Sequence, residues 1–118
     1  MSSERADRDL LDDIREAAHR IAVYTAGMTY DEFLADLRTQ DAVIRNLEII
    51  GEAAKKVSRV LRTQYGTVPW KGMAGVRDRL IHDYFGVNLD IVWHIITTEL
   101  PEAIVQMEAI LQTDEENG

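Results

Sequence analysis

An eight-residue segment contains side chains that could act together on a phosphate group. It reads Arg77-Asp78-Arg79-Leu80-Ile81-His82-Asp83-Tyr84. An arginine keeps its positive charge at every physiological pH and can hold two phosphate oxygens through its fork of N–H donors. A histidine can accept or donate a proton near neutral pH. The types and spacing of Arg77 and His82 therefore indicate phosphate chemistry.

We expect this segment to lie on a helix, and helical geometry decides which of its side chains can meet. Residues five apart are separated by about 140° around the axis, so Arg77 and His82 would not share a face without a local distortion. Asp78 and His82 would share one, which makes Asp78 a candidate to orient the imidazole. Arg77 and Tyr84 would also share a face. In a plainer alternative, Arg77 and His82 belong to a structural network with Asp78 and Asp83.

The spacing Arg77-x4-His82-x-Tyr84 resembles the signature of HEPN-domain ribonucleases. The form with a trailing tyrosine is similar to the HepT toxins, the partners of minimal nucleotidyltransferase antitoxins of the MntA type. Further blocks of the chain resemble that family in the same order: Arg45 to Ala53, Val68-Pro69-Trp70, Met73-Ala74-Gly75 and Leu80-Ile81-His82. The resemblance covers residues 7 to 112, and the ordered set of blocks is more specific than the short motif alone.

This resemblance implies a homodimeric endoribonuclease that needs no metal or other cofactor for cleavage. Arg77 would stabilise the charge that develops on the phosphate, and His82 would transfer a proton. The ribose 2′-hydroxyl would attack the phosphate and leave a 2′,3′-cyclic phosphate and a 5′-hydroxyl. Because one histidine cannot be base and acid on opposite sides of the phosphate at once, a two-fold dimer would complete the site.

The resemblance also implies a regulatory role for Tyr84. In toxins similar to this one, the antitoxin uses ATP and Mg²⁺ to transfer AMP to the motif tyrosine. A nucleotide phosphate beside Arg77 would occupy the anion site and repel the RNA backbone. Alternatively, Tyr84 is a half-buried core aromatic residue whose hydroxyl reaches a helix end.

The distribution of charge bears on RNA binding. The net charge of −8 opposes binding to a polyanion, but residues 53–82 carry seven Lys or Arg against one Asp, a local charge of +6 that leaves −14 elsewhere. The candidate contacts to the RNA backbone in this window are Lys55, Lys56, Arg59 and Arg79. Alternatively, the first three line only the solvated side of an amphipathic helix. The acidic remainder would suit a basic protein partner.

The periodicity of apolar residues predicts an all-α, HEPN-like bundle of about five helices in a single domain, residues 1–118. The expected helices span residues 7–26, a short stretch after a capping box at 29–32, residues 41–64, residues 69–86 with the motif, and residues 88–112. Gly51 lies within an apolar stripe, where it would permit close approach by another helix. Pro101 would start a new helix or kink the last one. No strand periodicity is evident, and residues 1–6 and 113–118 are expected to be frayed.

Several classes of site and location are disfavoured. The absence of cysteine excludes disulfides and thiolate metal ligands, and three scattered histidines, His19, His82 and His94, do not form a ligand cluster. No apolar run approaches the ~20 residues that a membrane span requires, and no signal peptide is evident, so we expect a cytoplasmic protein. Trp70 and Trp93 are expected to be core residues rather than platforms for bases.

Two other functions remain open. The chain could be a non-catalytic subunit that binds substrate or acts as a scaffold for a separate nucleotidyltransferase. It could also be a dimeric interaction module with a vestigial site. Loss of RNA cleavage on substitution of His82, with the dimer intact, would distinguish a catalytic role from both.

Overall fold

The fold is all-α, as predicted. The structure is a computed structural model that describes the backbone of residues 3–83 and 86–117 and the side chains of residues 6–80 and 86–112. The helices of the described part are α1 (Ser3–Thr25), α2 (Tyr30–Leu34), α3 (Leu37–Lys56), α4 (Arg59–Gln64), α5 (Trp70–Ala74), α6 (Val76–Leu80), α7 (Leu89–His94), the π-helix η1 (Ile95–Glu99) and α8 (Leu100–Asn117). The short strands β1 (Ile81–Asp83) and β2 (Gly86–Val87) form an antiparallel hairpin.

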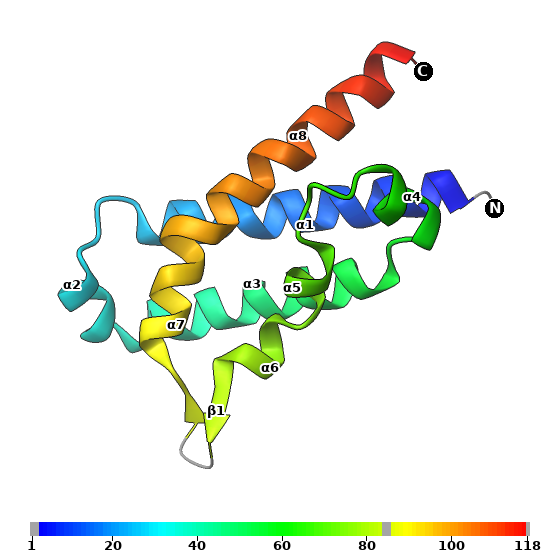
Figure 1. Cartoon of the computed structure of the whole chain (residues 1–118). Coiled ribbons are helices and arrows are strands. Elements are labelled where there is room, and N and C mark those ends of the chain that lie inside the picture. Colours follow the sequence, from blue (N-terminus) through cyan, green and yellow to red (C-terminus); the bar gives the residue numbers. More distant parts are fainter. Residues whose placement is uncertain (1–2, 84–85, 118) are drawn as a thin grey trace.

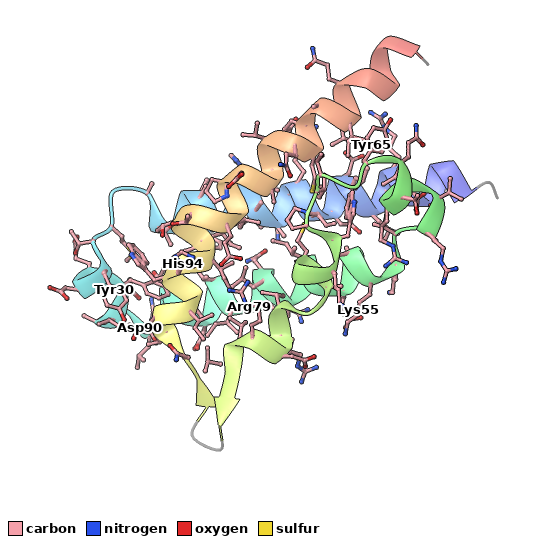
Figure 2. All side chains as sticks on the ribbon, in the orientation of Figure 1. Tyr30, Lys55, Tyr65, Arg79, Asp90 and His94 are labelled. Atoms are coloured by element: carbon pink, nitrogen blue, oxygen red, sulfur yellow. The ribbon has the colours of Figure 1, made fainter. Side chains whose placement is uncertain are left out.

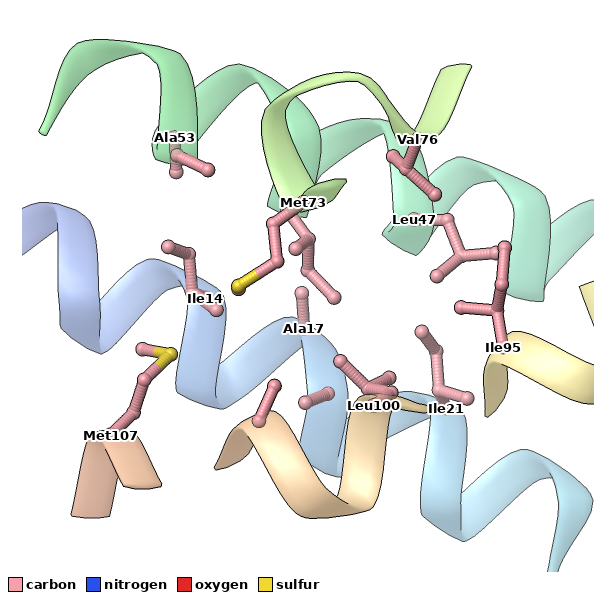
Figure 3. Packing of buried hydrophobic residues seen from close by; sticks show 14 of the residues in the cluster. Ile14, Ala17, Ile21, Leu47, Ala53, Met73, Val76, Ile95, Leu100 and Met107 are labelled. Carbon is pink, nitrogen blue, oxygen red and sulfur yellow. The ribbon is translucent and has the colours of Figure 1, made fainter. Parts of the chain in front are cut away.

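The two long helices α1 and α3 run antiparallel and pack along each other, while α5 and α6 contact α3 and α8 contacts α1 (Figure 1). The hydrophobic core lies where these elements meet. Ile14, Ala17 and Ile21 of α1 face Leu47 and Ala53 of α3, with Met73, Val76, Ile95, Leu100 and Met107 around them (Figure 3). The predicted apolar periodicity of the long helices therefore corresponds to burial against one another.

The prediction for Gly51 is confirmed. A Cβ at this position of α3 would lie 3.0 Å from Val76 Cγ1 and 3.3 Å from the backbone oxygen of Met73. A hydrogen in place of a side chain lets α5 and α6 approach the backbone of α3 at this point. Since α6 contains Arg77, this contact also sets the distance between the motif and α3.

The predicted capping box is present at the start of α2. The backbone N–H of Glu32 donates to Thr29 Oγ1, and the N–H of Thr29 donates to Glu32 Oε1. The hydrogen bond that the carboxylate accepts from the backbone of Thr29 is the main cause of the lowered pKa of Glu32. Asn88 caps α7 as predicted, because its side chain accepts a hydrogen bond from the N–H of Ile91.

The prediction of one helix over residues 41–64 is wrong. The helix begins earlier, at Leu37, and ends at Lys56, where Val57 is extended and Ser58 caps a separate helix, α4. The buried carboxylate of Asp7 in α1 accepts hydrogen bonds from the backbone N–H and the hydroxyl of Ser58. These two bonds fix Ser58 in a conformation that the helix cannot adopt, so a contact with α1 divides the predicted helix.

The prediction that the motif lies on a helix extending to Gly86 is also wrong. Gly75 separates α5 from α6, and α6 ends at Leu80, after which residues 81–83 are a strand. The sequence predicted no strands, and this prediction is wrong at the same segment. The assignment of Asp78 and His82, and of Arg77 and Tyr84, to common helix faces therefore has no basis in this fold.

The last helical region is continuous through Pro101. The π-helix η1 precedes Pro101, and the N–H of Leu100 donates to the oxygen of Ile95. Within a regular α-helix the proline ring would clash with the carbonyl of Thr97, and the wider turn relieves this clash. Helical backbone also extends into both segments that we expected to be frayed, because α1 begins at Ser3 and α8 continues to Asn117.

Candidate functional site

The candidate site lies where α6 ends and the β1–β2 hairpin begins. Val76 and Leu80 are buried and attach α6 to the core, which leaves Arg77, Asp78 and Arg79 exposed on the outside of this short helix. The backbone N–H of Asn88 donates to the oxygen of Leu80 at 2.9 Å. This bond closes the hairpin directly against the end of α6.

The hairpin backbone is irregular between its two strands. Ile81 pairs with Val87 and Asp83 pairs with Gly86, with a shift in register between them, and Gly86 has a φ of 106°. Only glycine adopts this backbone conformation readily. His82 belongs to β1, so its backbone lies within two residues of α6, but its side chain and all of Tyr84 lie outside the described residues.

Arg77 lines a cleft of about 310 Å³ between α6 and the outer faces of α3 and α1. The predicted RNA contacts Lys55 and Lys56 line the same cleft. The structure thus brings together three of the predicted cations, from positions more than 20 residues apart in the sequence. An anion in this cleft would face positive charge from two helices.

A fourth cation, Arg45, lines the cleft and was not predicted as a site residue. A signal for it exists in the sequence, since Arg45, Glu48, Glu52, Lys55 and Lys56 recur at the three- and four-residue steps of one helix face. Three carboxylates, Asp13, Glu48 and Glu52, also line the cleft. One of them, Glu52, lies 3.7 Å from the ammonium nitrogen of Lys55, and both side chains are largely exposed.

The other two predicted RNA contacts lie apart from this cleft. Arg59 is the first residue of α4, beyond the break at Ser58. Arg79 points toward the C-terminal helical region, where its two terminal nitrogens donate to both oxygens of Glu99 at 2.7 and 2.9 Å (Figure 2). Hydrogen bonding to Arg79 lowers the pKa of Glu99, and the same bonds raise the pKa of Arg79.

The histidines predicted to be structural or surface residues are both exposed. His94 Nε2 lies 3.3 Å from Glu99 Oε2. His19 lines a second groove, of about 720 Å³, between α1 and the η1–α8 region. Trp70 is buried and donates its Nε1–H to the oxygen of Tyr65, while Trp93 packs on Phe33 with ring centroids 5.2 Å apart. The prediction that both tryptophans are packing residues is confirmed.

Among residues 6–80 and 86–112, no group of three or more His, Asp or Glu side chains is arranged to hold a metal ion. In the same part of the chain, no helix is both long enough and apolar enough to span a membrane.

Several known proteins that are similar to this chain carry a ribonuclease name. Residues 14–110 match the family model described as "Ribonuclease HepT-like". A candidate RNase of Methanocaldococcus jannaschii is 49% identical over 105 residues, covering 89% of this chain and 87% of the relative. The probable ribonuclease HepT of Thermococcus cleftensis is 42% identical over 98 residues, covering 83% of this chain and 89% of the relative. No solved structure matches the chain significantly.

The fold and the cleft define an all-α protein in which four cations and three carboxylates line a cleft beside α6. The family match is broader than the motif, because it takes in α3, α5 and α8 as well as α6. The chain belongs to the HepT-like ribonuclease family. The family predicted from the motif and its flanking blocks is therefore confirmed.

Proposed function

We propose that this protein is a metal-independent endoribonuclease whose site is formed by Arg77, His82 and Asp78. The observation that carries the proposal is the cleft that Arg77 lines together with Lys55 and Lys56, because Arg77 belongs to α6, the short helix that leads directly into the strand of His82. Its assignment to RNA draws on the family and on relatives named as ribonucleases.

In the proposed reaction, the ribose 2′-oxygen attacks the adjacent phosphorus and the bond from phosphorus to the 5′-oxygen breaks. His82 takes the 2′-hydroxyl proton or supplies the proton to the 5′-oxygen. Asp78 is exposed on α6, four residues before His82, and would orient the imidazole across the junction of α6 with β1 rather than along one helix face. Arg77 stabilises the negative charge on the phosphate in the transition state. Since both proton transfers occur together, His82 of a second copy performs the other one in a homodimer.

The RNA backbone would run along the cleft, with Lys55 and Lys56 neutralising phosphates beside the one that is cleaved. Arg59 would contribute more weakly, because it lies beyond the cleft. Glu48 and Glu52 line the same cleft and would oppose a polyanion. The distribution of these charges favours contact with few nucleotides rather than with a long duplex.

We further propose that the protein is the toxin of a toxin–antitoxin pair. An MntA-like nucleotidyltransferase would transfer AMP from ATP to the phenol oxygen of Tyr84 in a reaction that uses Mg²⁺ and releases pyrophosphate. The adenylylated tyrosine would place a phosphate near Arg77 and block access of RNA. This arrangement would let the partner keep the nuclease inactive until unmodified protein is made.

The test is cleavage of a mixed RNA pool by purified, unmodified protein in EDTA, with the ends of the products identified. We expect 2′,3′-cyclic phosphate and 5′-hydroxyl ends from the wild type, and loss of cleavage in His82→Ala and Arg77→Ala. His19→Ala is the matched control, because His19 is exposed and lines a different groove, and it should cleave normally. Circular dichroism and light scattering would show whether each variant keeps its fold and oligomeric state.

A correctly folded, unmodified wild-type protein that fails to cleave would contradict the proposal. The favoured function would then be the non-catalytic subunit of a two-component nucleotidyltransferase, a function with which the carboxylates in the cleft are compatible. Intact mass after coexpression with a nucleotidyltransferase tests the modification separately. One added AMP that disappears in Tyr84→Phe would support it, and AMP on another residue would contradict it.

A further inference from the structure

Arg79 and Glu99 join the motif helix to the C-terminal helical region. They lie 20 residues apart in the sequence, and the guanidinium donates to both carboxylate oxygens, at 2.7 and 2.9 Å. A two-point contact of this kind fixes the orientation of both groups as well as their separation. Arg79 belongs to α6, between Asp78 and the buried Leu80, so the contact acts on the helix that presents Arg77.

The π-helix determines where Glu99 points. His94 and Glu99 are five residues apart, a spacing that an α-helix separates by about 140°. In η1 the backbone hydrogen bonds span five residues, and His94 Nε2 lies 3.3 Å from Glu99 Oε2. The carboxylate of Glu99 therefore lies between an imidazole of α7 and the guanidinium of α6.

The pair also covers an apolar part of the core. A small cavity of about 50 Å³ beneath it is lined by Val76 of α6, Ile95 and Leu100 of the C-terminal region and both members of the pair. The side chains of Arg79 and Glu99 are about 40% exposed, at 43% and 38%. Partial removal from water strengthens this ion pair relative to one on an open surface.

We infer that Glu99 is a positioning residue for the nuclease site, acting through Arg79 to hold α6 and the adjoining hairpin in place. The inference rests on the proposed function in one respect, since it assigns the consequence of the pair to RNA cleavage. It also revises the predicted role of Arg79, whose donors to Glu99 are not available to an RNA phosphate at the same time.

Exchange of the two charges tests the inference. Arg79→Glu and Glu99→Arg should each lower kcat for RNA cleavage by about tenfold to a hundredfold with little change in KM, because misplacement of a catalytic group acts mainly on the transition state. The double variant should recover most of the lost kcat. Glu16→Arg, which breaks the exposed pair of Arg20 with Glu16 at 2.8 Å on α1, is the control and should leave cleavage unchanged.

The exchanged pair separates positioning from direct RNA contact. If Arg79 binds RNA itself, the double variant places a carboxylate against the backbone and stays impaired with a raised KM, and the inference is overturned. Single variants with unchanged kcat would overturn it as well. Recovery of kcat in the double variant supports it, since the two charges are then needed only for each other.

A second readout does not depend on RNA cleavage. The amide hydrogen of Asn88, which donates to the oxygen of Leu80, reports on the closure of the hairpin against α6. Its exchange with solvent should be at least tenfold faster in each single variant and near the wild-type rate in the double variant. Unchanged exchange in the single variants would contradict the positioning role. If the wild type did not cleave RNA but this pattern appeared, the proposed function would fail while the structural role of Glu99 stood.

Discussion

The carboxylate of Asp7 accepts two hydrogen bonds from Ser58, one from its backbone N–H at 2.8 Å and one from its hydroxyl. The two residues are 51 positions apart, and Asp7 is 5% exposed. Ser58 also accepts a hydrogen bond from the N–H of Leu61 and so caps α4. A single buried polar contact thus joins the start of α1 to the junction between α3 and α4.

Replacement of Asp7 by alanine should lower the free energy of unfolding by about 2 kcal/mol. The reason is that two donors of Ser58 would lose a charged acceptor at a partly buried site, where hydrogen bonds to charged groups contribute about 1.5–3 kcal/mol. Urea denaturation of Asp7→Ala, Ser58→Ala and the double variant would measure the change and the coupling between the two residues. Asp9→Ala, at an exposed position of the same helix, is the control. Additive effects of the Asp7 and Ser58 substitutions would contradict this prediction.

Substitution of Gly51 by alanine should destabilise the protein, although alanine favours helix by about 1 kcal/mol. The added Cβ would lie 3.0 Å from Val76 Cγ1 and 3.3 Å from the oxygen of Met73, so α5 and α6 would have to move away from α3. Gly72→Ala makes the same chemical change on α5, where nothing lies within 4 Å of the new Cβ, and it should be neutral or stabilising. Thermal denaturation of both variants would compare them. A more stable Gly51→Ala variant would show that this interface is loose.

The broad plan of the fold could be predicted from the sequence because it depends on local pattern. The apolar spacing of α1 and α3, the capping box at Thr29 and the cap at Asn88 all act within a few residues. The break at Ser58 depends instead on Asp7, a partner 51 residues away that no local pattern reveals. The end of α6 at Leu80 depends on a nearer contact, because the N–H of Asn88, eight residues further on, donates to the oxygen of Leu80 and closes the hairpin that replaces the helix.

The candidate site could be predicted only in part, for a related reason. Residue types identified Arg77, Lys55 and Lys56 as cations, but only the packing of α6 against α3 places them in one cleft. By residue type alone, Arg79 was predicted to be an RNA contact like Lys55 and Lys56. In the structure it pairs with Glu99 on another side of α6. Charge in a sequence window therefore overstates the number of cations available to RNA, because it does not show which of them already have partners.

Lys56 should contribute more to RNA binding than Arg59, although both were predicted as contacts. Lys56 lines the cleft with Arg77, and Arg59 lies beyond the break at Ser58, in α4. With His82→Ala as background to prevent cleavage, Lys56→Ala should weaken binding of a short single-stranded RNA and reduce the slope of log affinity against log salt by about 0.7. Arg59→Ala should change this slope much less. Fluorescence anisotropy from 50 to 200 mM salt, a range over which the Debye length falls about twofold, would measure both. Equal salt slopes for the two variants would show that RNA does not bind along the cleft.

The pH dependence of stability should identify the contribution of Glu99. Its pKa is lowered from the ordinary 4.5, chiefly by the hydrogen bonds from Arg79, so the folded protein binds this proton less readily than the unfolded chain does. The stabilisation is therefore fully present above the unfolded pKa and is lost as pH falls through the lower folded pKa. Because the pair is partly exposed, Glu99→Gln should lower the free energy of unfolding by about 0.5–1 kcal/mol near pH 7.

The difference between wild type and Glu99→Gln should be present above the ordinary pKa of 4.5 and shrink as pH falls through the lower folded pKa of Glu99. Glu32 and Asp36 also have lowered pKa values, from the hydrogen bonds of their helix caps, and would weaken both proteins alike in the same acidic range. Urea denaturation gives the free energy of unfolding of each protein, and the difference between the two values at each pH removes the effect of Glu32 and Asp36. A difference that persists at low pH would contradict the assignment of the stabilisation to the ion pair, because protonated glutamate and glutamine are neutral side chains of nearly the same shape and neither forms the ion pair with Arg79.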